Sequence, residues 1–300
     1  MRLSIAIVNW NTSALLAACL SSIKRSHEVG AGFQIPPQLH EIIVVDNASE
    51  DFDEAAFRAE FPEVKLIRNS NNAGCARANN QALEIASGDY VLLLNPDTEI
   101  PLEDASEASC TEASSSPIQT LIDFMASHPR AAAAGPKLVR PDGQIDRSVR
   151  SFPYPGPIAW EYLGLSKLFP KSRLFGAYRM TWFGYDTVAE VDQPMGSALI
   201  LNKAAIQDVG LMDESFPIFF NEVDWLYRAK QKGWQVYFVP DATIVHHGAA
   251  STRQVKRRVM VGESHKSLLR FYAKHFKGRI FAPIYYFTVA CIRISMLLRG

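Results

Sequence analysis

Short apolar runs alternate with longer segments of mixed polarity along the first hundred residues of the chain. Four of these runs predict β-strands buried on both faces, because each is short and ends in polar or turn-forming residues. They lie at residues 3–8, 41–45, 64–67 and 90–94, and helices are predicted between them at 14–23, 53–61 and 76–86. This alternation is typical of an α/β fold with a doubly wound, mostly parallel sheet and helices on both faces.

The pattern is less regular after residue 100. The small, polar segment 103–117 predicts a flexible surface insertion. The aromatic, Pro- and Gly-rich segment 151–186 predicts a packed but irregular lid or specificity region. Further strands are predicted at 131–139, 194–201, 234–239 and 243–245, and further helices at 118–127, 203–209 and 221–233.

The last fifty residues differ in character. Residues 251–275 predict a long basic helix or helix pair, and residues 280–298 form an apolar, aromatic run that Arg293 interrupts. Basic residues precede this run, which favours a helix lying along a membrane interface over one that spans the membrane. We therefore expect a globular α/β domain over 1–250 and a membrane-associating helical region over 251–300.

Asp46 and Asp97 each follow a buried strand of the predicted sheet. Pro96 ends the strand before Asp97, because proline cannot donate to a strand ladder. Ligands bind at the carboxyl edge of open α/β sheets. There, Asp97 could hold a divalent cation against a phosphate, and Asp46 could accept a hydrogen bond from a nucleobase or sugar hydroxyl. The alternative for each carboxylate is a cap on an ordinary turn.

The loop and helix start at 69–79 form a further candidate. This segment is rich in Asn, and it contains Gly74, which permits close backbone approach, and Arg77, which could reach a phosphate. The alternative is an ordinary Asn-capped helix.

Two pairs of ionisable residues are also candidates. Glu222 and Asp224 lie at the start of a predicted helix. A role in capping that helix accounts for the presence of Asp224. Glu222 follows aromatic residues that we expect to be buried, and it could act as a general base. His246 and His247 end a strand and could bind a metal or a phosphate. Hydrogen bonding within a loop is the alternative for either histidine.

Composition narrows the classes of function. The 300 residues include 31 basic and 31 acidic side chains, and zero net charge argues against a nucleic-acid binder. The four cysteines are scattered without a Cys-x-x-Cys pair, which favours a reducing compartment. The first apolar stretch ends at Asn9, too early for a signal-peptide core. We expect a cytoplasmic protein, peripheral on the inner face of the cell membrane.

These motifs together resemble those of the inverting glycosyltransferases of family 2, which have the GT-A fold. The resemblance covers about residues 3–250 and points to the rhamnosyltransferase-like branch, which builds bacterial surface polysaccharides. It rests on Ile7–Asn11, Val44–Ser49, Asn69–Asn79, Leu94–Asp97, Gly196–Leu199, Asn221–Trp225 and Val245–Gly248.

The resemblance implies a role for each motif. Asn95-Pro96-Asp97 stands where the family has its Asp-x-Asp motif, which leaves Asp97 as the main carboxylate ligand of Mg²⁺ or Mn²⁺, assisted by His246 or His247. Glu222 stands at the catalytic base, but Asn221 replaces the first acid of the usual pair, so Asp224 stays an alternative. The implied nucleotide-sugar site consists of Asn9, Asn11, Asp46, Asn69, Asn72, Gly74, Arg77, Asn79 and Asn95.

The expected function is a metal-dependent, inverting sugar transfer. The donor would be a dTDP- or UDP-sugar, with rhamnose as the first candidate for the sugar. A hydroxyl of a growing cell-surface glycan or lipid-linked acceptor would receive the sugar. A sugar nucleotidyltransferase is one alternative, but it needs a Gly-rich, Lys- or Arg-bearing loop after the first strand, and Asn9–Thr12 is not such a loop. A non-catalytic sugar-nucleotide-binding or scaffold protein is the other; it would not need Asp97, Glu222 and His246.

Overall fold

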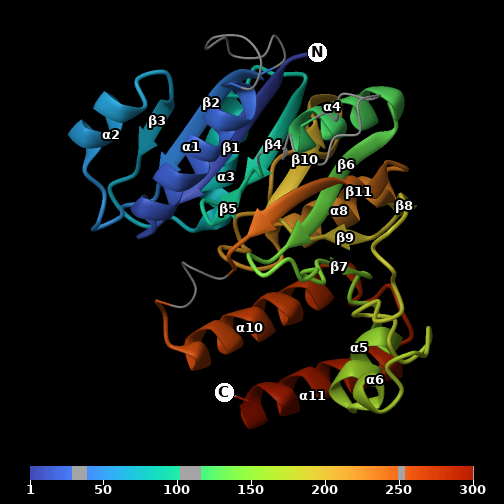
Figure 1. Cartoon of the computed structure of the whole chain (residues 1–300). Helices are drawn as coiled ribbons and strands as arrows, with labels where there is room; N and C mark the ends of the chain where they lie inside the picture. The colour runs from blue at the N-terminus through green and yellow to red at the C-terminus, as the bar shows by residue number, and fades with distance from the viewer. Residues whose placement is uncertain (29–38, 102–115, 249–253, 300) are drawn as a thin grey trace.

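The computed structural model describes residues 1–28, 39–101, 116–248 and 254–299 (Figure 1). Its strands are β1 (Leu3–Asn9), β2 (Leu39–Asp46), β3 (Lys65–Arg68), β4 (Tyr90–Leu94), β5 (Thr98–Glu99), β6 (Ala131–Val139), β7 (Val149–Arg150), β8 (Ala189–Glu190), β9 (Gln193–Pro194), β10 (Ala198–Asn202) and β11 (Gln235–His246). One large sheet has the order β3-β2-β1-β4-β10-β6-β11-β5, with β8 also paired to β11. β7 and β9 form a separate ribbon.

Helices cover both faces of the large sheet. They are α1 (Ser13–Glu28), α2 (Glu54–Glu60), α3 (Cys75–Ile85), α4 (Pro117–Ser127), α5 (Pro155–Tyr162), α6 (Leu165–Leu168), α7 (Lys203–Val209), α8 (Asn221–Gln231), α10 (Arg257–His275) and α11 (Ala282–Arg299). Side chains of α1, α2 and α4 belong to one buried cluster, and those of α3, α7 and α8 belong to the other. The predicted α/β fold with a mostly parallel, doubly covered sheet is confirmed.

One inner strand runs against the others. β1 to β4 are parallel, and β11 is parallel to β6, whereas β10 is antiparallel to both β4 and β6. After β6 the chain passes through α5 and α6 beyond the carboxyl edge of the sheet (Figure 1), and β8 then pairs with the first half of β11. β10 starts opposite the end of β4, with Ala198 paired to Leu94, which brings Gly196 and Ser197 next to the end of β4.

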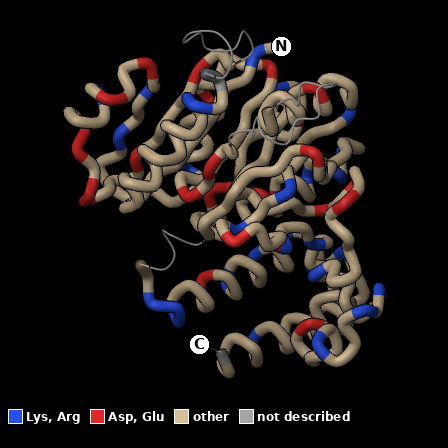
Figure 2. Tube along the Cα trace, in the orientation of Figure 1, with Lys and Arg blue, Asp and Glu red and all other residues tan. Residues whose placement is uncertain are grey.

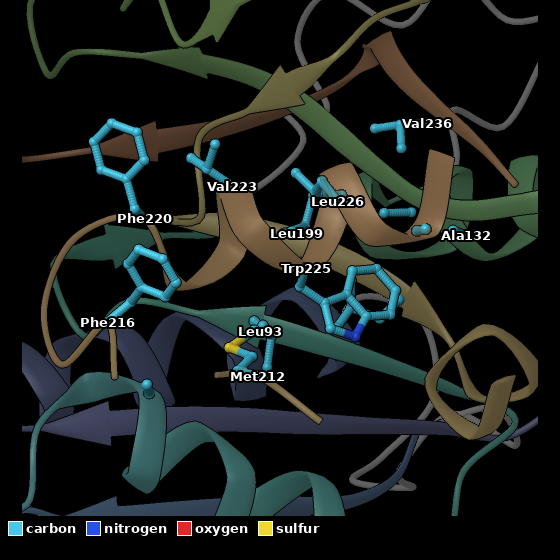
Figure 3. Close-up of a cluster of buried hydrophobic side chains, with 14 of the residues drawn as sticks. Leu93, Ala132, Leu199, Met212, Phe216, Phe220, Val223, Trp225, Leu226 and Val236 are labelled. Carbon is cyan, nitrogen blue, oxygen red and sulfur yellow. The ribbon is translucent and has the colours of Figure 1, made fainter. Parts of the chain in front are cut away.

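The buried side of α8 fixes that helix firmly against the sheet. Figure 3 shows Val223, Trp225 and Leu226 of α8 packed with Leu93 and Leu199 of the neighbouring strands. The helix starts after Phe220, a non-glycine residue in the left-handed region with φ of 73°. The Trp225 indole N–H donates to the carbonyl of Gly210 at 2.8 Å. The first turn of α8 is thus held in one position relative to the sheet.

α10 crosses beyond the carboxyl ends of the strands (Figure 1). Just before its start, the Gln254 amide donates to the carbonyl of Asn11 after β1. At its far end, His275 contacts Asp224 in α8 at 2.7 Å. Leu268 and Phe271 of α10 belong to the same buried cluster as α8. The predicted division at residue 250 stays a prediction.

Three details differ from the sequence-based expectation. The segment 151–186 contains the short helices α5 and α6. Pro155 is compatible with the start of α5, because the N–H groups of the first helical turn make no hydrogen bond within the helix. The predicted separate strands at 234–239 and 243–245 form one strand, β11, whose pairing with β6 shifts between Val239 and Thr243. α10 begins at Arg257, later than the predicted 251. The predicted insertion 103–117 lies outside the described residues, apart from its last two positions.

Neither C-terminal helix, nor any other helix among the described residues, has the length and apolar content needed to cross a membrane. α11 packs on α10 and α5. Its buried side consists of Tyr285, Thr288, Ile292 and Ser295. That spacing of three to four residues leaves the opposite side of the helix exposed.

Candidate active site

The ends of β1 and β2 are joined by polar side chains at the carboxyl edge. Asn9 and Asp46 are paired in register, and the Asn9 amide donates to the Asp46 carboxylate at 3.0 Å. The backbone N–H of Ser49 also donates to Asp46, and the Arg68 guanidinium lies 3.7 Å from it. Asn9 and Asp46 are fully buried. The structure therefore places both residues at the predicted edge, where they hold the two strand ends together.

An amide network continues from this edge into the loop before α3. Asn47 donates to Asn72 at 2.8 Å and accepts from Asn69 at 3.1 Å. Asn69 also exchanges hydrogen bonds with Gln81 of α3. Asn11 adopts a left-handed backbone conformation, and its side-chain oxygen accepts from the N–H of Glu50 at 2.8 Å. These predicted binding residues give the loop its shape.

The start of α3 packs against the segment that leads into α8. Gly74 has φ of 87°, and a Cβ at this position would lie 2.9 Å from the Pro217 carbonyl oxygen, which accepts from the N–H of Cys75 at 2.6 Å. Asn79 donates to the Cys75 sulfur at 3.3 Å. Arg77 instead forms an exposed ion pair with Glu214 at 3.1 Å. Arg77 is therefore engaged on the outer side of α3.

Asn95, Gly196 and Glu222 meet beyond the ends of β4 and β10. The N–H of Asn95 donates to the Ser197 carbonyl at 2.8 Å, and its amide lies 3.3 Å from the Ser197 hydroxyl. A Cβ added to Gly196 would lie 3.2 Å from Cγ of Glu222. Glycine at 196 thus leaves the room that the Glu222 side chain occupies.

Glu222 has the electrostatic character of a proton acceptor. Burial raises the pKa of its carboxyl group, while a backbone hydrogen bond and the positive charge of Arg150 in β7 oppose the rise. The pKa of the neighbouring Cys75 thiol is raised to about 12, mainly by burial and further by the charge of Glu222. Glu222 therefore points into a poorly solvated space between α3 and Gly196, where a carboxylate takes up a proton readily.

Asp224 is held in a different way. Its carboxylate is fully buried and contacts Arg228 at 2.8 Å, Lys274 at 2.7 Å and His275 at 2.7 Å. Burial alone would raise the pKa of Asp224, but the hydrogen bonds from His275, Lys274 and Arg228 outweigh burial and lower it. Asp224 joins α8 to α10 and stays ionised.

Asp97 and His246 come together because β5 pairs with the end of β11. Thr98 is opposite His246 in this antiparallel pair. The Asp97 carboxylate and Nε2 of His246 lie 3.6 Å apart, and both side chains are nearly buried. Nδ1 of His246 lies 3.0 Å from the Asp146 carboxylate. The hydrogen bond to His246 lowers the pKa of Asp146.

His247 lies apart from this group. Its backbone N–H donates to the Asp97 carbonyl at 2.9 Å, but its exposed ring contacts Glu99 at 3.3 Å. β11 ends at His246, and the contacts of the two rings show that His246, rather than His247, faces the Asp97 carboxylate.

The family model described as Glycosyl transferase family 2 matches residues 4–108. Over these residues, about a third of the chain, the sequence is similar to glycosyltransferase family 2. The match includes the ends of β1, β2 and β4 and the loop before α3, where the structure places Asn9, Asp46, Asn72 and Asp97.

Similarity to curated proteins extends beyond that segment. The chain is 27% identical to the N-acetylglucosaminyl-diphospho-decaprenol L-rhamnosyltransferase of Mycobacterium tuberculosis over 260 residues, which cover 81% of this chain and 78% of the relative. It is 23% identical to the low-salt glycan biosynthesis hexosyltransferase Agl10 of Haloferax volcanii, over 64% of this chain and 54% of that protein.

Solved structures agree on the fold. The mannosyltransferase PcManGT from Pyrobaculum calidifontis, in complex with GDP-Man and Mn²⁺, superposes with a TM-score of 0.58 at 16% identity, over 99% of this chain and 69% of that one. Residues 1–349 of TarS from S. aureus, in complex with UDP-GlcNAc, give 0.57 at 14% identity, over 100% and 72% of the two chains. The chain therefore has the GT-A fold of these glycosyltransferases.

The donor atoms around Asp97 suit the divalent cation that the family resemblance implies. With Nδ1 of His246 donating to Asp146, Nε2 and the Asp97 carboxylate face each other as two acceptors at 3.6 Å, an arrangement that a shared proton or a cation stabilises. No cluster of three acidic, His or Cys ligands occurs among the described residues. A two-ligand site fits Mg²⁺ or Mn²⁺, whose other positions are commonly filled by phosphate oxygens and water.

Sequence reasoning missed Asp146 and the roles of Gly196 and Asn47. Asp146 follows a surface turn, and no pattern in the sequence pairs it with a histidine 100 residues later. Asn47 lies within the Val44–Ser49 motif, but nothing in that motif indicates that its side chain bridges Asn69 and Asn72. Gly196 lies in a quoted motif, and its role depends on the neighbouring Glu222 side chain, which only the fold reveals.

Proposed function

We propose that this chain transfers a sugar from a nucleotide-diphosphosugar to an acceptor hydroxyl with inversion at the anomeric carbon. One observation carries the proposal: Asn95, Gly196 and Glu222 meet beyond β4 and β10, and Asp97, two residues from Asn95, faces His246. A leaving diphosphate needs charge compensation, and an attacking hydroxyl needs a base. The two groups of side chains supply these two requirements.

Asp97 and His246 would hold the divalent cation, and Asp146 would fix the His246 ring. When bound, the cation would offset the negative charge that develops on the leaving nucleoside diphosphate. Asn95 and the start of α3 would position the donor. The fixed amide network of Asn47, Asn69 and Asn72 shapes the loop on the nucleotide side of the sheet.

Glu222 would act as the general base. It would take the proton of the acceptor hydroxyl while that oxygen forms its bond to the anomeric carbon and the bond to the diphosphate oxygen breaks. One displacement inverts the configuration. Glu222 is favoured over Asp224, because three cationic or polar partners already hold the Asp224 carboxylate.

We propose rhamnose as the sugar, a dTDP- or UDP-sugar as the donor, and a growing or lipid-linked glycan as the acceptor. The name of the rhamnosyltransferase relative supports the sugar and the lipid-linked acceptor, and the UDP-GlcNAc complex of TarS supports a UDP-sugar donor. The name of that relative includes decaprenol, a lipid carrier, which favours action at a membrane. The outward side of α11 supports peripheral membrane contact, since Ile284, Phe287, Ile294, Leu297 and Leu298 are between 50% and 82% exposed. An amphipathic helix of this kind binds at the headgroup region.

The test of the transfer reaction is a screen of nucleotide sugars. The protein is incubated with dTDP-rhamnose, UDP-glucose, UDP-N-acetylglucosamine and GDP-mannose, with Mn²⁺ or with EDTA, and the release of nucleoside diphosphate is measured. We expect release from one of the first three donors that EDTA suppresses. Binding of a nucleotide sugar without turnover, in the presence of Mn²⁺ and glycan acceptors, would instead support a scaffold protein.

Membrane contact is tested separately by co-sedimentation with vesicles. We expect the protein to sediment with phosphatidylcholine vesicles that contain phosphatidylglycerol, and Leu297→Ser/Leu298→Ser to sediment less. If the variant sedimented as well as the wild type, the exposed end of α11 would not be the membrane contact.

A further inference from the structure

A pocket of about 540 Å³ lies at the first turns of α10, away from the residues proposed for catalysis. Arg257, Arg258, Val261, Ser264 and His265 line it. His265 is buried, and both ring nitrogens are engaged: Nδ1 with the Val261 carbonyl at 2.8 Å, and Nε2 with the Ser295 hydroxyl of α11 at 3.3 Å. The pocket therefore has a fixed polar side that is tied to α11.

The charge around this pocket favours an anion. Residues 250–300 contain eleven Lys or Arg residues and a single acidic residue, Glu263, although the whole chain has no net charge. Figure 2 shows basic positions at the start of α10. Among the described residues, neither Arg257 nor Arg258 forms an ion pair with a carboxylate. Arginine presents several N–H donors in a planar fork that matches phosphate oxygens.

Apolar side chains lie beside the basic ones. Ser295, which contacts His265, is followed within one helical turn by Leu297 and Leu298, with 82% and 81% of their surfaces exposed. Ile294 of α11 is 56% exposed and Val259 of α10 is 49% exposed. An anion that carries a hydrocarbon chain could place its charge at the arginines and its chain along this side of α11.

The pocket lies at the start of α10, whereas the far end of the helix contacts Asp224 of α8. Gln254, three residues before Arg257, contacts the carbonyl of Asn11 just after β1. A ligand bound here would therefore lie beside the proposed membrane contact, at the end of α10 that follows the contact with the loop after β1.

We propose that this pocket binds the phosphate group of a phosphorylated lipid that carries the acceptor sugar, with Arg257 and Arg258 as the phosphate-binding residues. The lipid chain runs along the exposed end of α11. This inference rests on the proposed transfer function, because it supplies the site for that reaction's second substrate. The pocket would recognise the phosphate and the chain, and the sugar would extend along α10 towards its far end, where α8 carries Glu222.

Binding of farnesyl diphosphate tests the proposal without requiring turnover. The full chain is titrated with farnesyl diphosphate in the presence of EDTA and saturating UDP, which exclude metal-dependent binding and occupy a nucleotide site. We expect saturable binding, much weaker binding of farnesol and of inorganic diphosphate, and a Kd at least tenfold higher for Arg257→Gln/Arg258→Gln. Lys277→Gln/Arg279→Gln removes the same charge at the other end of α10 and should change Kd less than twofold.

Equal Kd values for the two double variants would overturn the proposal, as would loss of all farnesyl diphosphate binding when UDP is added. Inorganic diphosphate binding as tightly as farnesyl diphosphate would also contradict it, because the apolar side of α11 would then contribute nothing. Donor turnover without an acceptor, measured in the same variants, reports on the proposed function independently. That turnover should be unchanged in Lys277→Gln/Arg279→Gln.

Discussion

The first turn of α8 presents two carboxylates to two different regions of the molecule. Glu222 faces the sheet edge, next to Gly196 and Cys75, and burial raises its pKa. Asp224 faces α10, where Arg228, Lys274 and His275 lower its pKa. The two residues are nearly alike in chemistry and lie two positions apart in sequence, yet they have different partners. A carboxylate in a poorly solvated space can exchange a proton during a reaction, whereas one surrounded by cations serves as a fixed connection between helices.

Glu222→Gln should have the largest effect of any change at this edge. The amide cannot take the proton of the acceptor hydroxyl, so we expect turnover with the true acceptor to fall about 10²–10⁴-fold. Steady-state kinetics measures this loss, and Asp224→Asn is the matched control two residues away. If Glu222→Gln kept wild-type turnover, the assignment of the base to the sheet-edge side of α8 would be wrong.

Glu222→Gln should also change the pH dependence of stability. Because the folded-state pKa of Glu222 is raised above its unfolded value, the ionised carboxylate destabilises the fold as pH rises through that folded pKa. Glu222→Gln should therefore be at least as stable as the wild type at pH 8, and this advantage should vanish near pH 4. Thermal unfolding at the two pH values provides the measurement.

Asp224→Asn should act mainly on stability. Removing one charge from a buried ion cluster leaves its partners uncompensated, and we expect the free energy of unfolding to fall by about 2–3 kcal/mol, less than for a fully buried pair because Lys274 is partly exposed. Urea denaturation measures the change, with the exposed Asp208→Asn as control. Because the pKa of Asp224 is lowered in the folded state, its contribution is present at neutral pH and is lost as pH falls through that lowered value.

A fall in turnover as large as that of Glu222→Gln, with stability unchanged, would reverse the two assignments. Turnover is therefore measured at a temperature at which the Asp224→Asn variant is fully folded.

The pH dependence of turnover should carry the signature of Glu222. Since the base must be ionised and its pKa is raised, the acidic limb of the kcat/KM profile should lie above the ordinary glutamate value of about 4.3. Arg150 favours the ionised form, so Arg150→Gln should move the limb to still higher pH. A limb that stayed in place in this variant would mean that another group titrates.

Gly196→Ala should have the smallest effect. The added methyl would lie 3.2 Å from Cγ of Glu222, which must then shift by a few tenths of an ångström. We expect a several-fold fall in kcat with little change in Tm, because displacement of a base weakens proton transfer more than it disturbs packing. Gly262→Ala, where an added Cβ meets nothing within 4 Å, is the control and should leave kcat unchanged.

The sheet could be predicted from the sequence because its strands are buried on both faces. β4 and β6 have the predicted bounds, since continuous apolar runs ending in turn residues leave few alternatives. The reversed direction of β10 could not be predicted, because it depends on where the chain travels between β6 and β10.

The candidate site was predictable only in part. Strand ends indicated Asp46 and Asp97, and the structure places both at one edge of the sheet. The partners of Asp224 on α10, fifty residues later, and of His246 at Asp146 depend on tertiary contacts. Sequence spacing alone therefore does not indicate which of Glu222 and Asp224 is the base, whereas the contacts of the two side chains favour Glu222.

The most direct test is the position of Mn²⁺ in crystals grown with the nucleoside diphosphate of the preferred donor. We expect one anomalous peak bonded to the Asp97 carboxylate and Nε2 of His246, with the diphosphate on its other side and the Glu222 carboxylate facing the space beyond. A nucleotide bound elsewhere, or Mn²⁺ found only at His247 and Glu99, would contradict the claim that these side chains form one site for sugar transfer.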